Sequence, residues 1–278
     1  METKHTHTRL VITPTGPVHI GHAHIARLNR RLAFDTGGTF VYRFEDKMAE
    51  TTGFKTGREE VCDANLHDLA AFGLGPTPAE DLVAHGFDGN WGCLLQGDCG
   101  LTHFWYRRLG FQEFFGVWPP PCSDEAPRNY RSVSGDTVDR VVHPFVILER
   151  AVMDVATGRN CIIRGEELLN EASAYGHYAQ IVGGWPSPAQ YYIPCLRREA
   201  PGTIASSAPT TAGMFLTDVM EAGRTAEELW AFLDRYVWTA GAAPAGEWMF
   251  PSLILPLLAP APLIPEKEWQ RFLKKGLK

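Results

Sequence analysis

The chain has 278 residues, of which 45% are hydrophobic and 21% charged, and it carries a net charge of −6. These values are typical of a globular protein with one sizeable core, built as one large domain or one domain with an insertion. The negative balance excludes a global basic field that would attract nucleic acid, so we expect no DNA partner and only local RNA contacts.

Targeting and membrane signals are absent from the sequence. The first residues, METKHTHTRL, contain no apolar signal core, and we expect His5 and His7 to belong to a disordered tail. The most apolar stretch, Met249–Pro265, contains five prolines and cannot form a spanning helix. Six cysteines without a CxxC pair indicate reduced thiols. We therefore predict a cytoplasmic protein without a membrane partner.

The N-terminal segment has the pattern of a parallel α/β sheet. Thr8–Thr13 is a short apolar run that stops at Pro14, as a buried strand would. A helix is predicted over His22–Thr36, because apolar residues recur on one face and Gly37-Gly38 follows. Thr39–Asp46 is a second strand-like run. Together these segments predict a strand–turn–helix–strand unit.

In the rest of the chain, predicted strands and helices alternate less regularly. A glycine-, proline- and aromatic-rich stretch from Pro76 to about Asp139 indicates an insertion. The other predicted elements are a helix over Glu59–Gly73, strands over Val141–Leu148 and Asn160–Gly165, a helix over Glu166 to about Val182, a last strand over Tyr191–Leu196 and an amphipathic helix over Thr225–Val237.

The turn between the first strand and the first helix suits a phosphate ligand. A glycine-rich turn before a helix exposes backbone N–H groups and the positive end of the helix dipole. Gly16 and Gly21 allow close approach of a ligand, and His19 and His22 can both donate hydrogen bonds to one bound group. The alternative is a loop with chance histidines, but their place between strand and helix favours the functional interpretation.

The motifs resemble those of class I aminoacyl-tRNA synthetases of the glutamyl/glutaminyl subgroup. The similar segments are RLVITPTGPVHIGH (Arg9–His22), GGTFVYRFED (Gly37–Asp46), NLHDLAAFGLG (Asn65–Gly75), IIRGEELL (Ile162–Leu169) and, more weakly, EAGRTAEELWAFLDRYVW (Glu221–Trp238). The resemblance implies an α/β fold with a Rossmann-like, HUP-type parallel sheet, an inserted acceptor-binding-like subdomain and a C-terminal helical segment.

The resemblance also implies domain boundaries. The two halves of the Rossmann domain are expected over residues 1–75 and 140–196, and the insertion subdomain over residues 76–139. Residues 197–278 are expected to hold a degenerate signature loop and the helical segment. Only 40 residues follow Trp238, so we expect no anticodon-binding domain and a truncated paralog of the synthetases.

The resemblance assigns roles to individual residues. It implies that ATP and Mg²⁺ are bound, with the ATP phosphates at Thr15, Gly16, His19, Gly21 and His22. It implies an amino-acid pocket in which Glu45 holds the α-ammonium group and the arginines meet carboxylates, formed by Arg9, Thr13, Glu45 and Arg164.

Two features leave the pocket open to another interpretation. Glu45 and Arg43 can simply end a strand, and Arg164 can pair with Glu166 or Glu167. The tyrosine that the family places in this pocket falls near Val146 when the sequences are aligned without gaps.

The second signature of the family, a lysine-containing loop, is not matched. No lysine occurs between Lys55 and Lys267, although the family uses one to stabilise the leaving pyrophosphate. Loss of one such donor typically costs about 3 kcal/mol of transition-state stabilisation. Arg197 or Arg198 could substitute, and Ser206 and Ser207 could form a phosphate-facing hydroxyl turn. A partner protein that supplies the cation is a further alternative.

The insertion contains two weaker patterns. Cys93, Cys99, His103 and Cys122 have the residue types of a zinc site but not the family's spacing, so we predict no metal. Arginines and aromatic residues interleave there, either as a face for an RNA end or as an ordinary surface around a small core. They are Phe104, Trp105, Tyr106, Arg107, Arg108, Arg128, Tyr130, Arg131 and Arg140.

Two functions fit the sequence. The first is ATP-dependent activation of a carboxylate-bearing amino acid, Glu- or Asp-like, as its adenylate, with transfer to a tRNA acceptor end or to a small nucleophile. The second is a non-adenylating protein that binds a nucleotide or an aminoacyl-tRNA, which the missing lysine favours.

Overall fold

The structure is a computed structural model of the chain. It describes residues 5–14, 16–45, 58–87, 93–95, 130–131, 137–138, 144–165, 168, 171–183, 187–193, 196–198, 214–237 and 263–274.

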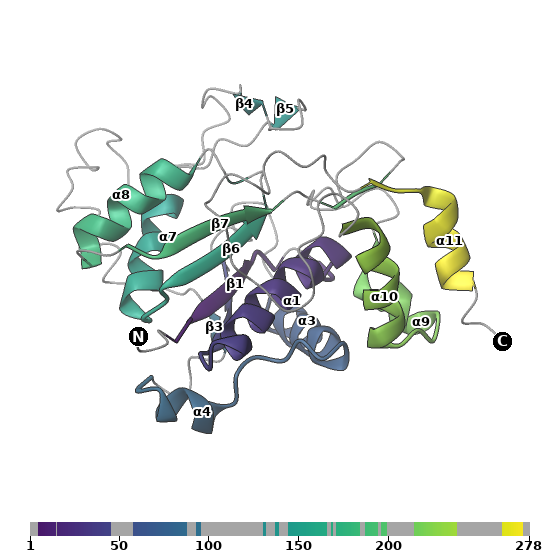
Figure 1. The fold of residues 1–278 in the computed structure, drawn as a ribbon, viewed down its shortest axis with the longest axis horizontal. Coiled ribbons are helices and arrows are strands. Elements are labelled where there is room, and N and C mark those ends of the chain that lie inside the picture. Colours follow the sequence, from purple (N-terminus) through teal and green to yellow (C-terminus); the bar gives the residue numbers. More distant parts are fainter. Residues whose placement is uncertain are drawn as a thin grey trace.

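Parallel strands form the centre of the fold. β1 (Thr8–Ile12) pairs with β2 (Phe40–Phe44), which pairs with β3 (Cys93–Leu95), all in parallel. β6 (Cys161–Gly165) pairs in parallel with β7 (Ala189–Ile193). β6 lies beside β1, so the strands follow the order β3-β2-β1-β6-β7 across the molecule (Figure 1). This order is that of a Rossmann-like sheet, which confirms the predicted fold class.

Helix α1 (Ile20–Asp35) follows β1 and packs on β1 and β6 (Figure 1). Its buried residues include Ala23, Ala26 and Ala33, whose small side chains bring the helix close to the sheet. The helix ends before Gly37, which adopts the left-handed conformation (φ 67°) that glycine tolerates without strain. The predicted strand, helix and strand are therefore confirmed, with boundaries shifted by up to two residues.

Asn29 of α1 connects the two halves of the sheet. Its side-chain amide donates to the carbonyl of Ile163 at 3.1 Å, and its side-chain oxygen accepts from the N–H of Ile163 at 3.2 Å. Its own carbonyl accepts from the Thr8 hydroxyl of β1 at 3.0 Å. A fully buried amide thus satisfies the backbone of β6 on the side that faces β1.

Two helices cover the β6–β7 half (Figure 1): α7 (Pro144–Ala156) and α8 (Ala172–Gly183) pack on each other. The prediction of a strand over Val141–Leu148 was wrong, because Pro144 to Leu148 begin α7. Ile147, Leu148, Ala151 and Val152 are buried at helical spacing. The apolar run is uninterrupted because α7 is covered on more than one side, and such runs do not distinguish a strand from a buried helix.

The remaining elements lie around this core. α3 (Arg58–Ala71) and α4 (Ala79–Ala84) follow β2. β4 (Tyr130–Arg131) and β5 (Thr137–Val138) form a small antiparallel pair. Most of the predicted insertion, residues 76–139, lies outside the described residues, so the domain boundaries stay predictions.

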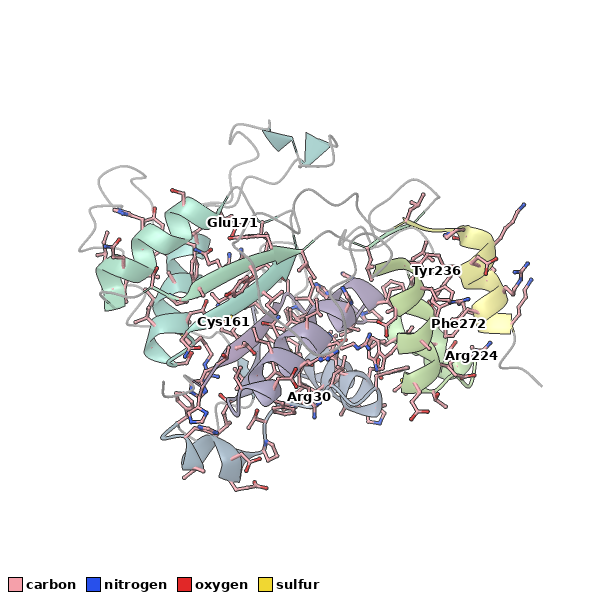
Figure 2. The ribbon with its side chains drawn as sticks, viewed as in Figure 1. Arg30, Cys161, Glu171, Arg224, Tyr236 and Phe272 are labelled. Atoms are coloured by element: carbon pink, nitrogen blue, oxygen red, sulfur yellow. The ribbon has the colours of Figure 1, made fainter. Side chains whose placement is uncertain are left out.

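The C-terminal part contains α9 (Leu216–Glu221), α10 (Ala226–Val237) and α11 (Glu266–Lys274). The Arg224 guanidinium lies over the Phe272 ring and donates to the Phe272 carbonyl, which joins the α9–α10 turn to α11 (Figure 2). β7 was wrongly predicted to be the last strand, because β8 (Arg197–Arg198) pairs in parallel with β9 (Leu263–Ile264). A two-residue strand whose partner lies 66 positions away leaves no local sequence signal.

His5 and His7 are ordered, which contradicts the expectation of a disordered tail. The His7 N–H donates to the Asn160 side chain at 2.8 Å, and the His7 ring contacts the Thr39 hydroxyl at 3.0 Å. The backbone before β1 thus extends the contact between β1 and β6. Among the described helices, none is both long and apolar enough to cross a membrane.

Candidate functional site

The start of α1 brings His19 and His22 together. His19 is the N-cap residue, and its Nδ1 accepts a hydrogen bond from the His22 backbone N–H at 3.2 Å. The two imidazole rings stack with 3.8 Å between centroids and 23° between planes. Gly21 is buried in the first turn, and Gly16 lies in the preceding turn. The structure therefore brings these four residues together at one helix N-terminus.

The backbone of residues 214–216 is hydrogen-bonded to the start of α1. The Ile20 N–H donates to the Met214 carbonyl at 2.8 Å, and the Leu216 N–H donates to the Val18 carbonyl at 3.0 Å. A side chain built at Gly16 would meet nothing within 4 Å, so packing within the described chain does not require glycine there. The first turn of α1 contains no acidic residue. The positive end of its dipole therefore favours an anion, and phosphate is the common one at such positions.

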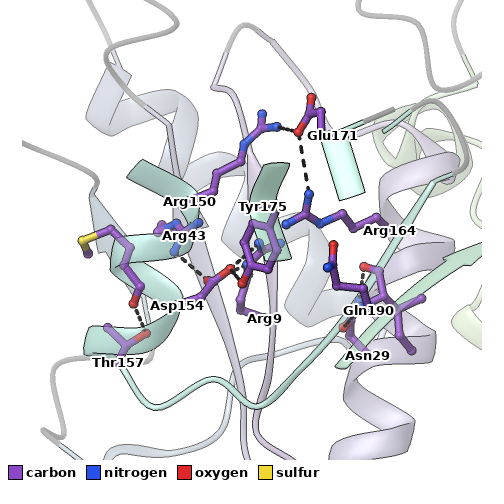
Figure 3. A network of polar contacts seen from close by, with 12 residues as sticks. Arg9, Asn29, Arg43, Arg150, Asp154, Thr157, Arg164, Glu171, Tyr175 and Gln190 are labelled. Atoms are coloured by element: carbon purple, nitrogen blue, oxygen red, sulfur yellow. Dashed lines mark hydrogen bonds and ion pairs between the residues drawn. The ribbon is translucent and has the colours of Figure 1, made fainter. Parts of the chain in front are cut away.

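A second group of polar residues is buried where β1, β2 and β6 meet α7 and the start of α8 (Figure 3). We call it the buried cluster. Its four guanidiniums exceed its three carboxylates, which leaves one excess positive charge. Its members are Arg9, Arg43, Glu45, Arg150, Asp154, Arg164, Glu171 and Tyr175.

Both carboxylate oxygens of Asp154 in α7 accept two hydrogen bonds each. Arg9 donates to both of its oxygens, from Nε at 2.9 Å and from a terminal nitrogen at 2.7 Å. Arg43 donates to Oδ1 at 2.8 Å, and the Tyr175 hydroxyl donates to Oδ2 at 2.8 Å. Burial opposes ionisation of Asp154, but Arg43 and Arg9 outweigh it and hold the pKa of this carboxyl well below its usual range. Asp154 therefore stays ionised.

Glu45, immediately after β2, is also paired. Arg150 of α7 donates to both oxygens of its carboxylate, from Nε at 2.6 Å and from a terminal nitrogen at 3.0 Å. The Thr13 hydroxyl donates to the same carboxylate at 3.4 Å. Burial raises the pKa of Glu45, but Arg150 more than compensates and the net shift is downward. Both oxygens of Glu45 thus have partners within the protein.

Arg164 differs from the other arginines. It is 3% exposed, yet none of its three guanidinium nitrogens has a hydrogen-bond partner among the described residues. Its plane lies over the Tyr175 ring at 4.3 Å, and Glu171 lies 3.7 Å away, beyond hydrogen-bond distance. Burial, assisted by Arg9, lowers the pKa of Arg164. The cluster therefore contains an unsatisfied guanidinium.

The structure brings together the residues predicted to form the amino-acid pocket: Arg9, Thr13, Glu45 and Arg164 all belong to or touch the buried cluster. It also shows what sequence reasoning missed, namely Arg150, Asp154, Glu171 and Tyr175. Arg150 and Asp154 are four residues apart, which places them on one helical face. That spacing is a usable signal only when residues 144–156 are interpreted as a helix.

Other predicted site residues lie outside the described part of the chain. Thr15, Ser206 and Ser207 do so, and Arg197 and Arg198 are described only in their backbone. Glu166 and Glu167, the predicted alternative partners of Arg164, and Asp46 also lie outside it.

The same holds for the insertion, where Cys99, His103, Cys122, Phe104, Trp105, Tyr106, Arg107, Arg108, Arg128 and Arg140 lie outside the described residues. Cys93, Tyr130 and Arg131 are described only in their backbone, as is Val146 in α7. Within the described residues, no group of histidine, cysteine, aspartate and glutamate side chains could hold a metal.

Residues 5–79 match the sequence model of the family described as tRNA synthetases class I (E and Q), catalytic domain. Glutamate–tRNA ligase 2 of Xanthobacter autotrophicus is 41% identical over 68 residues, which cover 24% of this chain and 14% of that protein. Glutamate–tRNA ligase of Gloeobacter violaceus is 40% identical over 93 residues, covering 33% and 15%. The matches thus span about one seventh of these relatives, and this N-terminal segment is glutamyl-tRNA synthetase-like.

Solved structures extend the likeness to the fold of nearly the whole chain. The glutamate–tRNA synthetase of Elizabethkingia anophelis superimposes with a TM-score of 0.57 at 15% identity, covering 97% of this chain and 70% of that one. A glutamate tRNA ligase of Elizabethkingia meningosepticum, in complex with its amino acid, gives a TM-score of 0.56 at 15% identity, with coverage of 97% and 69%. The chain therefore shares its fold with these two structures over nearly its whole length.

Proposed function

We propose that the chain binds ATP at the start of α1 and activates a carboxylate-bearing amino acid as its aminoacyl adenylate. The observation that carries the proposal is the arrangement of Gly16, His19 and His22 at the N-terminus of α1, inside the segment that matches the synthetase family. The second support is the buried cluster, whose excess positive charge suits an acidic substrate.

The reaction joins the two sites. A carboxylate oxygen of the substrate attacks the α-phosphorus of ATP, a new C(O)–O–P bond forms, and pyrophosphate leaves. The helix N-terminus and the two imidazoles would stabilise the negative charge on the phosphate oxygens. The Arg164 guanidinium, whose three nitrogens have no partner among the described residues, would hold and orient the acid.

Mg²⁺ is expected to accompany ATP, but no described cluster of protein ligands fits it. We therefore assign no step to protein-bound metal. The acceptor of the activated acid is proposed to be a tRNA end or a small nucleophile. ATP, the amino acid and this acceptor are the partners that the proposal requires.

A second function is favoured by one specific observation. No lysine occurs between Lys55 and Lys267, so the chain lacks the compact cation that stabilises the leaving pyrophosphate in the family it resembles. A protein that keeps the fold to bind a nucleotide or an aminoacyl-tRNA, without adenylation, would not need this lysine. A partner subunit that supplies the cation would also be consistent with it.

ATP–pyrophosphate exchange separates these functions. The assay runs over the twenty amino acids, glutamate and aspartate first, with and without tRNA. We expect exchange with an acidic amino acid. Direct binding of ATP or of an aminoacyl-tRNA without exchange would favour the non-adenylating function. A protein that shows no exchange and binds neither ATP nor an aminoacyl-tRNA would contradict both.

A further inference from the structure

Two groups of opposite charge that lack hydrogen-bond partners among the described residues lie next to each other in the buried cluster. Arg164 has three guanidinium nitrogens without a hydrogen-bond partner among the described residues. Glu171 has one carboxylate oxygen, Oε1, in the same condition, while its Oε2 lies 3.7 Å from Arg164. Both side chains are 2% exposed. Leaving such groups buried and unsatisfied costs stability, so they are the positions where a ligand gains most.

The other carboxylates near them are already occupied, whereas Arg43 also has two buried guanidinium nitrogens, Nε and Nη2, without a partner among the described residues. Both oxygens of Glu45 are held by Arg150, and both oxygens of Asp154 are held by Arg9. An ammonium group that reached Glu45 would have to displace a buried bidentate ion pair, which is unfavourable because it leaves the Arg150 charge buried without that partner. Binding at Glu171 Oε1 breaks no hydrogen bond.

Neighbouring residues fix both groups in place. Arg150 donates to Glu171 Oε2 at 2.7 Å, which holds the carboxylate and leaves Oε1 for another donor. The Tyr175 ring lies under the Arg164 guanidinium, and its hydroxyl is anchored on Asp154. Figure 3 shows Arg150, Glu171 and Arg164 side by side at one edge of the cluster. The two groups thus form a preorganised pair.

We propose that Glu171 and Arg164 are the specificity-determining residues of this site, with Glu171 receiving the substrate's ammonium group and Arg164 a carboxylate. A zwitterion satisfies both groups at once, whereas an acid without an amino group leaves Glu171 Oε1 unsatisfied. The inference rests on the proposed function in assuming that the ligand is a carboxylate-bearing amino acid. It moves ammonium recognition from Glu45, where the family resemblance places it, to a residue on the far side of Arg150.

Isothermal titration calorimetry without ATP tests the inference, because it requires binding but not catalysis. The ligands are L-glutamate and L-aspartate, and their counterparts without the amino group, glutarate and succinate. We expect the parent protein to bind one amino acid at least about tenfold more tightly than its counterpart, since a hydrogen bond to a charged group has about this value. Glu171→Gln is expected to bring that ratio close to one.

Three variants serve as comparisons. Glu45→Gln is expected to retain the preference for the amino acid, and Arg164→Gln to weaken binding of both members of a pair. Glu60→Gln, on the exposed surface of α3, is expected to change nothing. If Glu171→Gln does not fold, the affinity ratio is measured in Glu171→Asp instead. It keeps the charge beside Arg150 but shortens the side chain, so the ratio should still fall several-fold.

The outcomes are separable. Absence of binding by both amino acids overturns the inference, as does an unchanged ratio in the Glu171 variants or a ratio lost only in Glu45→Gln. Failure of the proposed function is different. An amino acid that binds with the expected preference, but supports no pyrophosphate exchange, contradicts adenylation and leaves this recognition site intact.

Discussion

The guanidinium of Arg9 holds both oxygens of Asp154, at 2.9 and 2.7 Å, although 145 positions separate the two residues in the chain. The pair fastens α7 to β1 inside the core, where both side chains are almost fully buried. It also withdraws Arg9 from direct contact with a ligand as long as Asp154 stays ionised. The pair is thus a structural centre of the candidate site.

Replacing Asp154 with Asn should destabilise the fold strongly. Arg9 and Arg43 would lose their shared anion while remaining buried, and removal of one partner from a buried ion pair typically costs about 3–5 kcal/mol. Urea unfolding followed by circular dichroism measures this loss. Asp35→Asn, which breaks the exposed pair with Arg31, is the control and should cost less than about 1 kcal/mol. Equal effects of the two substitutions would contradict this account.

Replacing His19 and His22 together with Ala should remove nucleotide binding while the protein stays folded. Each hydrogen bond to a charged phosphate contributes roughly 1.5–3 kcal/mol, so ATP affinity or turnover should fall by about two orders of magnitude or more. Because His19 caps α1, we also expect a loss of about 1 kcal/mol in stability. Calorimetry with ATP and thermal unfolding measure the two effects.

A single substitution separates capping from binding. His19→Asn keeps an N-cap side chain but removes the imidazole, and His67→Ala alters an exposed histidine of α3. The first should retain stability and lose affinity, and the second should affect neither. ATP binding at the parental level in the double Ala variant would show that the histidines have no role at the nucleotide.

His24 should make the protein sensitive to acid. Burial, together with Arg27, lowers its pKa from 6.5 to about 4. Below pH 6.5 the His24 side chain takes up a proton in the unfolded chain but not in the folded chain. The contribution of His24 to the free energy of unfolding is therefore fully present above pH 6.5 and is lost progressively as the pH falls to about 4. For this buried group the loss approaches about 3 kcal/mol.

His24→Gln removes that titration. The free energy of unfolding, measured by urea titration at about pH 7 and about pH 4.5, should depend less on pH in the variant than in the parent. His7, whose pKa burial and Arg159 also lower to about 4, contributes in the same direction and remains in both proteins. An identical pH dependence in variant and parent would refute the role of His24.

Asn29→Leu should uncouple the two halves of the sheet. The substitution removes both partners of the Ile163 backbone and leaves its N–H and carbonyl buried, at a cost of roughly 1–3 kcal/mol for each group. Thermal unfolding should therefore shift down by several degrees. Gln270→Ala, on the exposed side of α11, is the comparison and should leave the transition unchanged.

Local signals in the sequence were sufficient for the N-terminal unit. An apolar run that stops at Pro14, a helical pattern and Gly37 at a left-handed turn all act within a few residues, so they predict β1, α1 and β2 without knowledge of the rest. The family resemblance added the Rossmann-like fold and drew attention to Arg9, Glu45 and Arg164.

The partners of those residues depended on tertiary structure. An apolar stretch such as Phe145–Leu148 has the same composition in a buried strand and in a buried helix, and packing against α8 and β6 decides between them. Only as a helix does it place Arg150 against Glu45 and Asp154 against Arg9. The sequence by itself determined which charged residues the protein carries. Folding decided which of them neutralise one another and which, like Arg164 and Glu171, keep polar atoms without a partner among the described residues, because ion pairing depends on distances that only the folded chain creates.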